Sequence, residues 1–84
     1  MPLSHLMVSS IDKYVIQKVK ELRLNKGFSQ SRLAFELEQS NSFIAKVESG
    51  KYGKKYNIYH LNQIAIIFEC SPKDFLPKEP LKED

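Results

Sequence analysis

The chain has 84 residues, of which 42% are hydrophobic and 27% charged, and its formal net charge is +3 at pH 7. This length allows one domain, and the composition is that of a globular protein rather than a disordered one. A single cysteine, Cys70, excludes an intramolecular disulfide and a thiolate zinc site. We find neither an apolar run of membrane-spanning length nor a signal peptide, and we expect a cytoplasmic protein.

The charge is unevenly distributed along the chain. Three of the ten acidic residues lie in the last six positions, so the body of the chain is its more basic part. A basic body fits a polyanionic partner without demonstrating one.

The first expected element is an amphipathic helix. Its apolar residues recur at steps of four and three, namely Ile11, Val15, Val19 and Leu22. Ser9 or Ser10 would cap this helix, and Gly27 would end it. Residues 1–10 then form an N-terminal arm.

Two short helices are expected next, separated by about three residues. Ser29 would cap the first of them, which covers residues 30–37. Ser40 would cap the second, which runs to about Glu48 and ends at Gly50.

The rest of the chain is read as a loop, a helix, a short turn and a tail. Residues 50–57 hold glycines, tyrosines and lysines without periodicity and predict an exposed loop. Asn57 would cap a helix over 58–69, and Ser71 would cap a last short helical turn. We therefore expect an all-α, compact five-helix domain over residues 11–77, with a polar tail over 78–84.

The chain resembles the phage repressor and Cro-like (XRE-like) helix-turn-helix family. The resemblance covers about residues 15–76 and is carried by Arg23, Gly27-Phe28-Ser29-Gln30, Leu33-Ala34, Ser40-Asn41-Ser42-Phe43-Ile44 and Val47-Glu48-Ser49-Gly50. It implies a compact repressor-like DNA-binding domain whose second and third helices form the helix-turn-helix.

The resemblance implies that the third helix reads bases in the major groove. The base-contacting positions fall on Asn41, Ser42 and Lys46, with Phe43 able to touch a thymine methyl group. Asn pairs with adenine and Lys donates to guanine, so these residue types suit the role. The alternatives are that Asn41 and Ser42 only cap a helix, that Lys46 is an ordinary solvated lysine, and that Phe43 merely packs.

The resemblance also implies contacts with the phosphate backbone and an internal ion pair. Gln30 would bind a phosphate and brace the third helix, while Arg23 and Glu48 would pair inside the domain. The full set of expected phosphate contacts is Ser29, Gln30, Ser40, Ser49, Lys51, Tyr52, Lys54, Lys55 and Tyr56. The alternative for the lysine-rich loop is a purely solubilising role.

Three positions depart from the family pattern. The family usually has glycine and then an apolar residue in the turn between helices two and three, where this chain has Glu38 and Gln39. Glu69 likewise stands where glycine is usual. The following Cys70 takes an apolar position, and we interpret it as a small core residue rather than a reactive thiol.

The sequence therefore predicts a sequence-specific transcriptional regulator without enzymatic activity, cofactor, metal or membrane partner. We expect a homodimer on a near-palindromic operator in double-stranded DNA, with its interface around the last helices or formed on the DNA. Three settings remain open: a phage-like repressor, a restriction-modification controller and an antitoxin, the last with a toxin partner. The alternative function is a protein–protein interaction module on the same fold.

Overall fold

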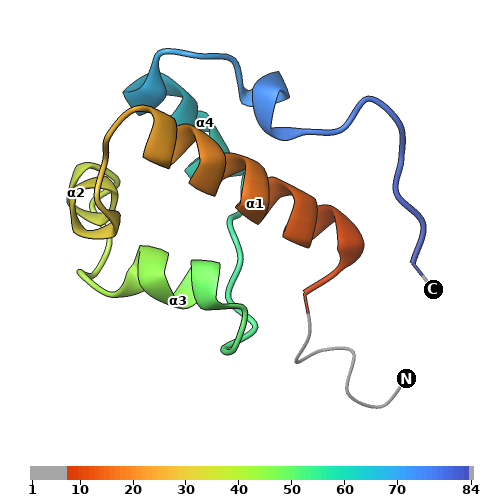
Figure 1. Ribbon diagram of the computed structural model, residues 1–84, viewed down its shortest axis with the longest axis horizontal. Helices are drawn as coiled ribbons and strands as arrows, with labels where there is room; N and C mark the ends of the chain where they lie inside the picture. Colours follow the sequence, from red (N-terminus) through yellow and green to blue (C-terminus); the bar gives the residue numbers. More distant parts are fainter. Residues whose placement is uncertain (1–7, 84) are drawn as a thin grey trace.

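The computed structural model describes residues 8–83, and all its regular elements there are helical (Figure 1). Residues 1–7 of the expected arm and Asp84 of the tail lie outside this part. The elements are α1 (Ser10–Asn25), α2 (Gln30–Glu36), α3 (Phe43–Ser49), α4 (Ile58–Phe68) and the 3-10 helix η2 (Pro72–Phe75). The all-α class is confirmed, but the fifth expected helix is only this four-residue 3-10 turn.

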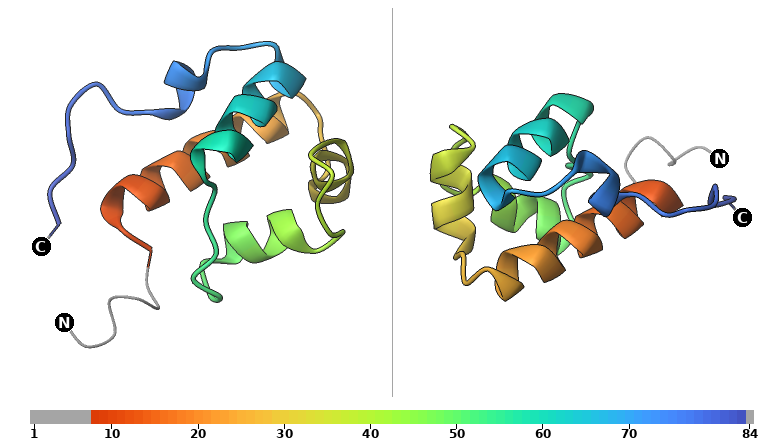
Figure 2. Two further views of the ribbon diagram at one scale, coloured as in Figure 1. Left: turned by 180° about the vertical axis from the view of Figure 1, so that it is seen from behind. Right: turned by 90° about the horizontal axis from the view of Figure 1, so that it is seen from above.

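The core draws on every helix. Its most deeply buried large side chains are Val19, Leu33, Ile44, Val47, Ile64, Phe68 and Phe75. Cys70 is half-buried and packs against this core. In Figure 1, α2 is seen end-on while α1 and α3 are seen from the side, so α2 crosses both steeply. Both α3 and η2 contact α1, and in the view of Figure 1 α3 lies below α1 and η2 above it, while Figure 2 shows the same helices from behind and from above.

Side chains at the predicted positions cap α1, α2 and α4. Of the two candidates for α1, Ser9 is the cap: its Oγ accepts the N–H of Asp12, whose carboxylate accepts the N–H of Ser9. Ser29 caps α2, and Asn57 caps α4. These bonds satisfy amides that the first turn of a helix leaves without partners.

The third helix begins later than its sequence suggests. It starts at Phe43 rather than Ser40, and Ser42 occupies the N-cap position without a side-chain hydrogen bond. The N–H of Phe43 donates to the carbonyl of Ser40 at 3.0 Å, so residues 40–43 form a turn ahead of the helix. Ser and Asn side chains compete with helical backbone bonds, which explains why this polar run stays out of the helix.

The tail folds back onto the start of the first helix. The carboxylate of Glu83 accepts the N–H of Ser10 at 2.8 Å, across 73 positions of sequence. No helix within residues 8–83 has the length and apolar character needed to cross a bilayer.

The turn between α2 and α3 is left-handed at a residue other than glycine. Glu38 has φ +60°, and the N–H of Gln39 that follows donates to the carbonyl of Ala34 at 2.9 Å. Glu69, after α4, has φ +58°. The turn at Glu38 therefore has the left-handed backbone for which the family usually has glycine at this position.

Glu38→Gly should therefore stabilise the fold. The left-handed conformation costs a non-glycine residue about 1–2 kcal/mol, partly offset by the greater freedom of glycine in the unfolded chain. We expect a net gain of up to about 1 kcal/mol, or about 4–8 °C in Tm, measured by thermal unfolding. Glu21→Gly in the exposed interior of α1 is the control and should lower the Tm. A lower Tm for Glu38→Gly would contradict the account of this turn.

Candidate nucleic-acid interface

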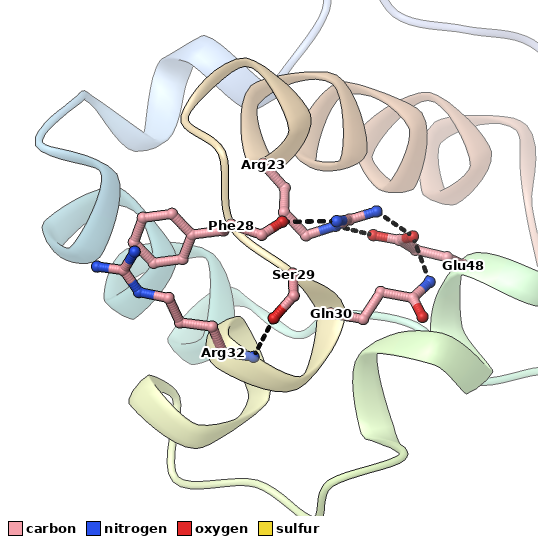
Figure 3. A network of polar contacts seen from close by, with 6 residues as sticks. All are labelled: Arg23, Phe28, Ser29, Gln30, Arg32 and Glu48. Carbon is pink, nitrogen blue, oxygen red and sulfur yellow. Dashed lines mark hydrogen bonds and ion pairs between the residues drawn. The ribbon is translucent and has the colours of Figure 1, made fainter.

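A buried ion pair joins the first helix to the third (Figure 3). Arg23 Nε donates to Glu48 Oε2 at 2.8 Å and Arg23 Nη2 donates to Glu48 Oε1 at 2.9 Å, so the contact is bidentate. Both side chains are more than nine-tenths buried. Arg23 Nη1 also donates to the carbonyl of Phe28 at 2.8 Å, which includes the loop before α2 in the network.

Gln30 extends this network to the second helix. Its Nε2 donates to Glu48 Oε1 at 2.9 Å, and Figure 3 shows the amide reaching from α2 towards α3. The same amide group has a second N–H, which makes no hydrogen bond to the residues that the structure describes. Gln30 therefore braces α3 and keeps one donor free.

The expected base-contacting residues differ in exposure. Asn41 and Ser42 are exposed in the turn that precedes α3, and Lys46 is half-buried on α3. Phe43 is half-buried, and its ring centroid lies 5.1 Å from that of His60 and 6.1 Å from that of Tyr56. The Phe43 ring is thus engaged in packing within the protein.

The expectation that Tyr56 contacts a phosphate is wrong. Its side chain is 6% exposed, and its hydroxyl is buried without a hydrogen-bond partner among residues 8–83. Burial, with a smaller contribution from the nearby Glu48 carboxylate, raises the pKa of Tyr56 above its ordinary value. The ring fills space beside Phe43 and His60, so it belongs to the core rather than to the surface of the loop.

The other loop residues remain on the surface. Lys51, Tyr52, Lys54 and Lys55 are all exposed. Lys55 Nζ lies 3.4 Å from a carboxylate oxygen of Asp12, with 55% of the lysine side chain exposed. Exposed pairs of this kind are weak, so this contact leaves Lys55 able to exchange partners.

The three serines expected at phosphates are exposed, and two of them make local bonds. Ser29 Oγ accepts the N–H of Arg32 at 3.0 Å. Ser49 Oγ donates to the carbonyl of Lys46 and accepts the N–H of Lys51, so it ties the end of α3 to the loop. The side chain of Ser40 makes no hydrogen bond to the described residues.

Arg32 and His60 have roles that the sequence reading missed. The Arg32 guanidinium lies 3.8 Å from the ring centroid of Phe28 and pairs with Glu36. The spacing of four residues between Arg32 and Glu36 on one helix was a usable signal for the pair. His60 Nδ1 accepts the N–H of Asn57, and burial lowers the pKa of His60. No cluster of three His, Cys, Asp or Glu residues suited to a metal ion occurs within residues 8–83.

Glu48→Ala should destabilise the protein strongly, because it leaves the Arg23 guanidinium buried without its carboxylate. Removing one partner of a buried pair costs about 3–5 kcal/mol. Glu36→Ala, which breaks the exposed pair with Arg32, is the matched control and should cost less than about 1 kcal/mol. Urea denaturation measures both variants. Equal midpoints for the two would show that the buried pair does not hold the fold.

Comparison with known proteins agrees with this geometry. A family model described as helix-turn-helix matches residues 19–75. No curated protein sequence matches the chain.

Solved structures share the fold. The restriction-modification controller protein C.AhdI from Aeromonas hydrophila is 26% identical with a TM-score of 0.64, and the match covers 77% of this chain and 94% of that one. The hypothetical transcription factor NHTF from Neisseria is 18% identical with a TM-score of 0.70, covering 81% and 76%.

The hydroxypropylphosphonic acid epoxidase from S. wedmorenis is also similar. It is 20% identical with a TM-score of 0.70, and the match covers 83% of this chain but only 36% of the enzyme. The likeness is therefore to one part of a larger enzyme and shows the fold alone. Because the helix-turn-helix family model matches residues 19–75, most of the chain, the chain belongs to the XRE-type helix-turn-helix family of DNA-binding transcriptional regulators.

Proposed function

We propose that this protein is a sequence-specific regulator that reads operator DNA with Asn41, Ser42 and Lys46. The observation that carries the proposal is the Glu48 carboxylate. It accepts hydrogen bonds from side chains of α1 and α2 and so fixes the orientation of α3 through its buried side. Asn41 and Ser42 remain exposed ahead of that helix. An Asn amide suits an adenine edge, and a Lys ammonium suits guanine O6 and N7.

The late start of α3 changes how two of these residues would meet the DNA. Asn41 and Ser42 project from the turn over residues 40–43 rather than from the first turn of a helix. We infer that they approach the base edges as part of this turn, while Lys46 approaches from α3 itself.

The phosphate contacts in this proposal come from two places. The free N–H of Gln30 would donate to one phosphate, and the exposed loop would supply Lys51, Tyr52, Lys54 and Lys55. A phosphate can displace the weak Asp12 partner of Lys55. Such contacts fix the register of a protein on the duplex without reading its sequence.

We further propose that α4 forms the interface of a homodimer. Over Ile58–Phe68 the helix carries no charged residue, although 27% of the chain is charged. Three of its apolar side chains are nevertheless strongly exposed, namely Ile58, Tyr59 and Ile66. A homodimer on a near-palindromic operator needs its two copies of α3 about 34 Å apart, one DNA turn, and in this proposal a second copy buries the exposed face of α4.

Of the three biological settings, the restriction-modification controller has support from the comparison with C.AhdI. That likeness spans 94% of the C.AhdI chain, so it covers nearly a whole protein of this kind. Restriction and methyltransferase genes beside the gene for this chain would support that setting, and a toxin gene would replace it with the antitoxin setting.

DNA binding should weaken steeply with salt. If the three loop lysines each neutralise one phosphate, log affinity should fall with log salt at a slope of about −2 to −3 per subunit. Fluorescence anisotropy on a duplex selected from genomic fragments measures this slope. Lys51→Gln should reduce it by about 1, whereas Lys73→Gln, on η2 at the opposite side of α1, should leave it unchanged. Absence of DNA binding at any salt concentration would favour the interaction module instead.

Ile66→Glu should convert the proposed dimer into a monomer, because it places a charge in the apolar face of α4. Sedimentation equilibrium measures the mass directly. Phe35→Glu on α2 is the control, since Phe35 is 81% exposed and outside α4. Dissociation by Phe35→Glu but not by Ile66→Glu would place the interface elsewhere.

A further inference from the structure

The ammonium group of Lys46 lies over an aromatic ring from the loop after α3. Lys46 Nζ is 5.6 Å from the ring centroid of Tyr52, within the range of a cation–π contact. No carboxylate among residues 8–83 forms an ion pair with Lys46. Among these residues, the Tyr52 ring is therefore the interaction partner of the Lys46 ammonium group.

The backbone brings these two side chains together by defined bonds. Gly50 has φ +72° and reverses the chain at the end of α3. Ser49 Oγ then joins the carbonyl of Lys46 to the N–H of Lys51, at 2.9 and 3.1 Å. The residue that carries the ammonium is thus tied to the segment that carries the ring.

A restrained ammonium matters because lysine is by itself a poor reader of sequence. Its long stem is flexible and its head group is a point charge, which can turn towards a base or towards any nearby phosphate. A side chain held in place before binding loses less conformational freedom when it binds. The ring limits Lys46 to the loop side of α3 and so to one part of the binding site.

We propose that Tyr52 is a positioning residue that sets the base specificity of Lys46. The inference rests on the proposed function, in which Lys46 reads a base. It gives Tyr52 two separable parts: the hydroxyl is available to a phosphate, whereas the ring holds the Lys46 ammonium. Tyr52 is 61% exposed, so its substitution should leave the core intact.

The test is selection of binding sites from random duplexes, followed by affinity measurements on the selected site. Lys46→Met should abolish the preference at one base pair of the half-site. Tyr52→Phe, which keeps the ring, should retain that preference, and Tyr52→Leu should weaken or lose it. Tyr52→Leu should also reduce affinity about two- to tenfold more in the wild-type background than in Lys46→Met, because only a lysine loses conformational freedom when the ring no longer restrains it before binding.

A measurement without DNA checks the geometry. The Hε protons of Lys46 should show an upfield ring-current shift by NMR in the wild type and in Tyr52→Phe, and the shift should disappear in Tyr52→Leu. All variants should remain folded, with a Tm at most about 8 °C below that of the wild type, because an exposed cation–π contact stabilises a fold only weakly.

Each contrary result identifies which idea fails. Equal base preferences in Tyr52→Phe and Tyr52→Leu, strictly additive affinity losses, or no ring-current shift would overturn the role of the Tyr52 ring. A wild-type protein that selects no sequence, or a Lys46→Met variant with unchanged preferences, would contradict the proposed function itself and the inference with it.

Discussion

The Glu48 carboxylate is the group on which the rest of this structure depends. It accepts two hydrogen bonds from Arg23 and one from Gln30, so three helices meet at one buried charge. An unpaired carboxylate would be expensive at this depth, which means that the helices must keep the arrangement that pairs it. The orientation of α3, a helix of only seven residues, is fixed by this network as well as by its buried Ile44 and Val47.

The surface of the domain has parts with different chemistry. The turn before α3 and the loop after it present amide, hydroxyl and ammonium groups, which suit a polyanion. The exposed part of α4 carries no Lys, Arg, Asp or Glu and presents three large apolar side chains, which suits a protein surface. The loop also serves the interior, because Tyr56 packs inward while its neighbour Lys55 stays exposed. This separation would let the proposed dimer bind DNA and a second copy at once.

Much of the fold could be predicted because it is encoded locally. The caps at Ser29 and Asn57 were readable from spacing, and the left-handed turn at Glu38 followed from the family pattern. The start of α3 could not be read, since a run of polar residues can cap a helix or form a turn before it. The burial of Tyr56 depends on tertiary packing, and the bond between Glu83 and Ser10 spans 73 positions, so neither has a local signal. The site residues of the turn and loop stay predictions until DNA is bound.

Mapping backbone amide chemical shifts during titration with a selected duplex tests the central claim most directly. The account predicts that the large changes fall on Gln30, on residues 40–46 and on residues 51–55, while the amides of η2 remain unaffected. Changes concentrated on the exposed face of α4 or on the tail, with residues 40–46 silent, would contradict it.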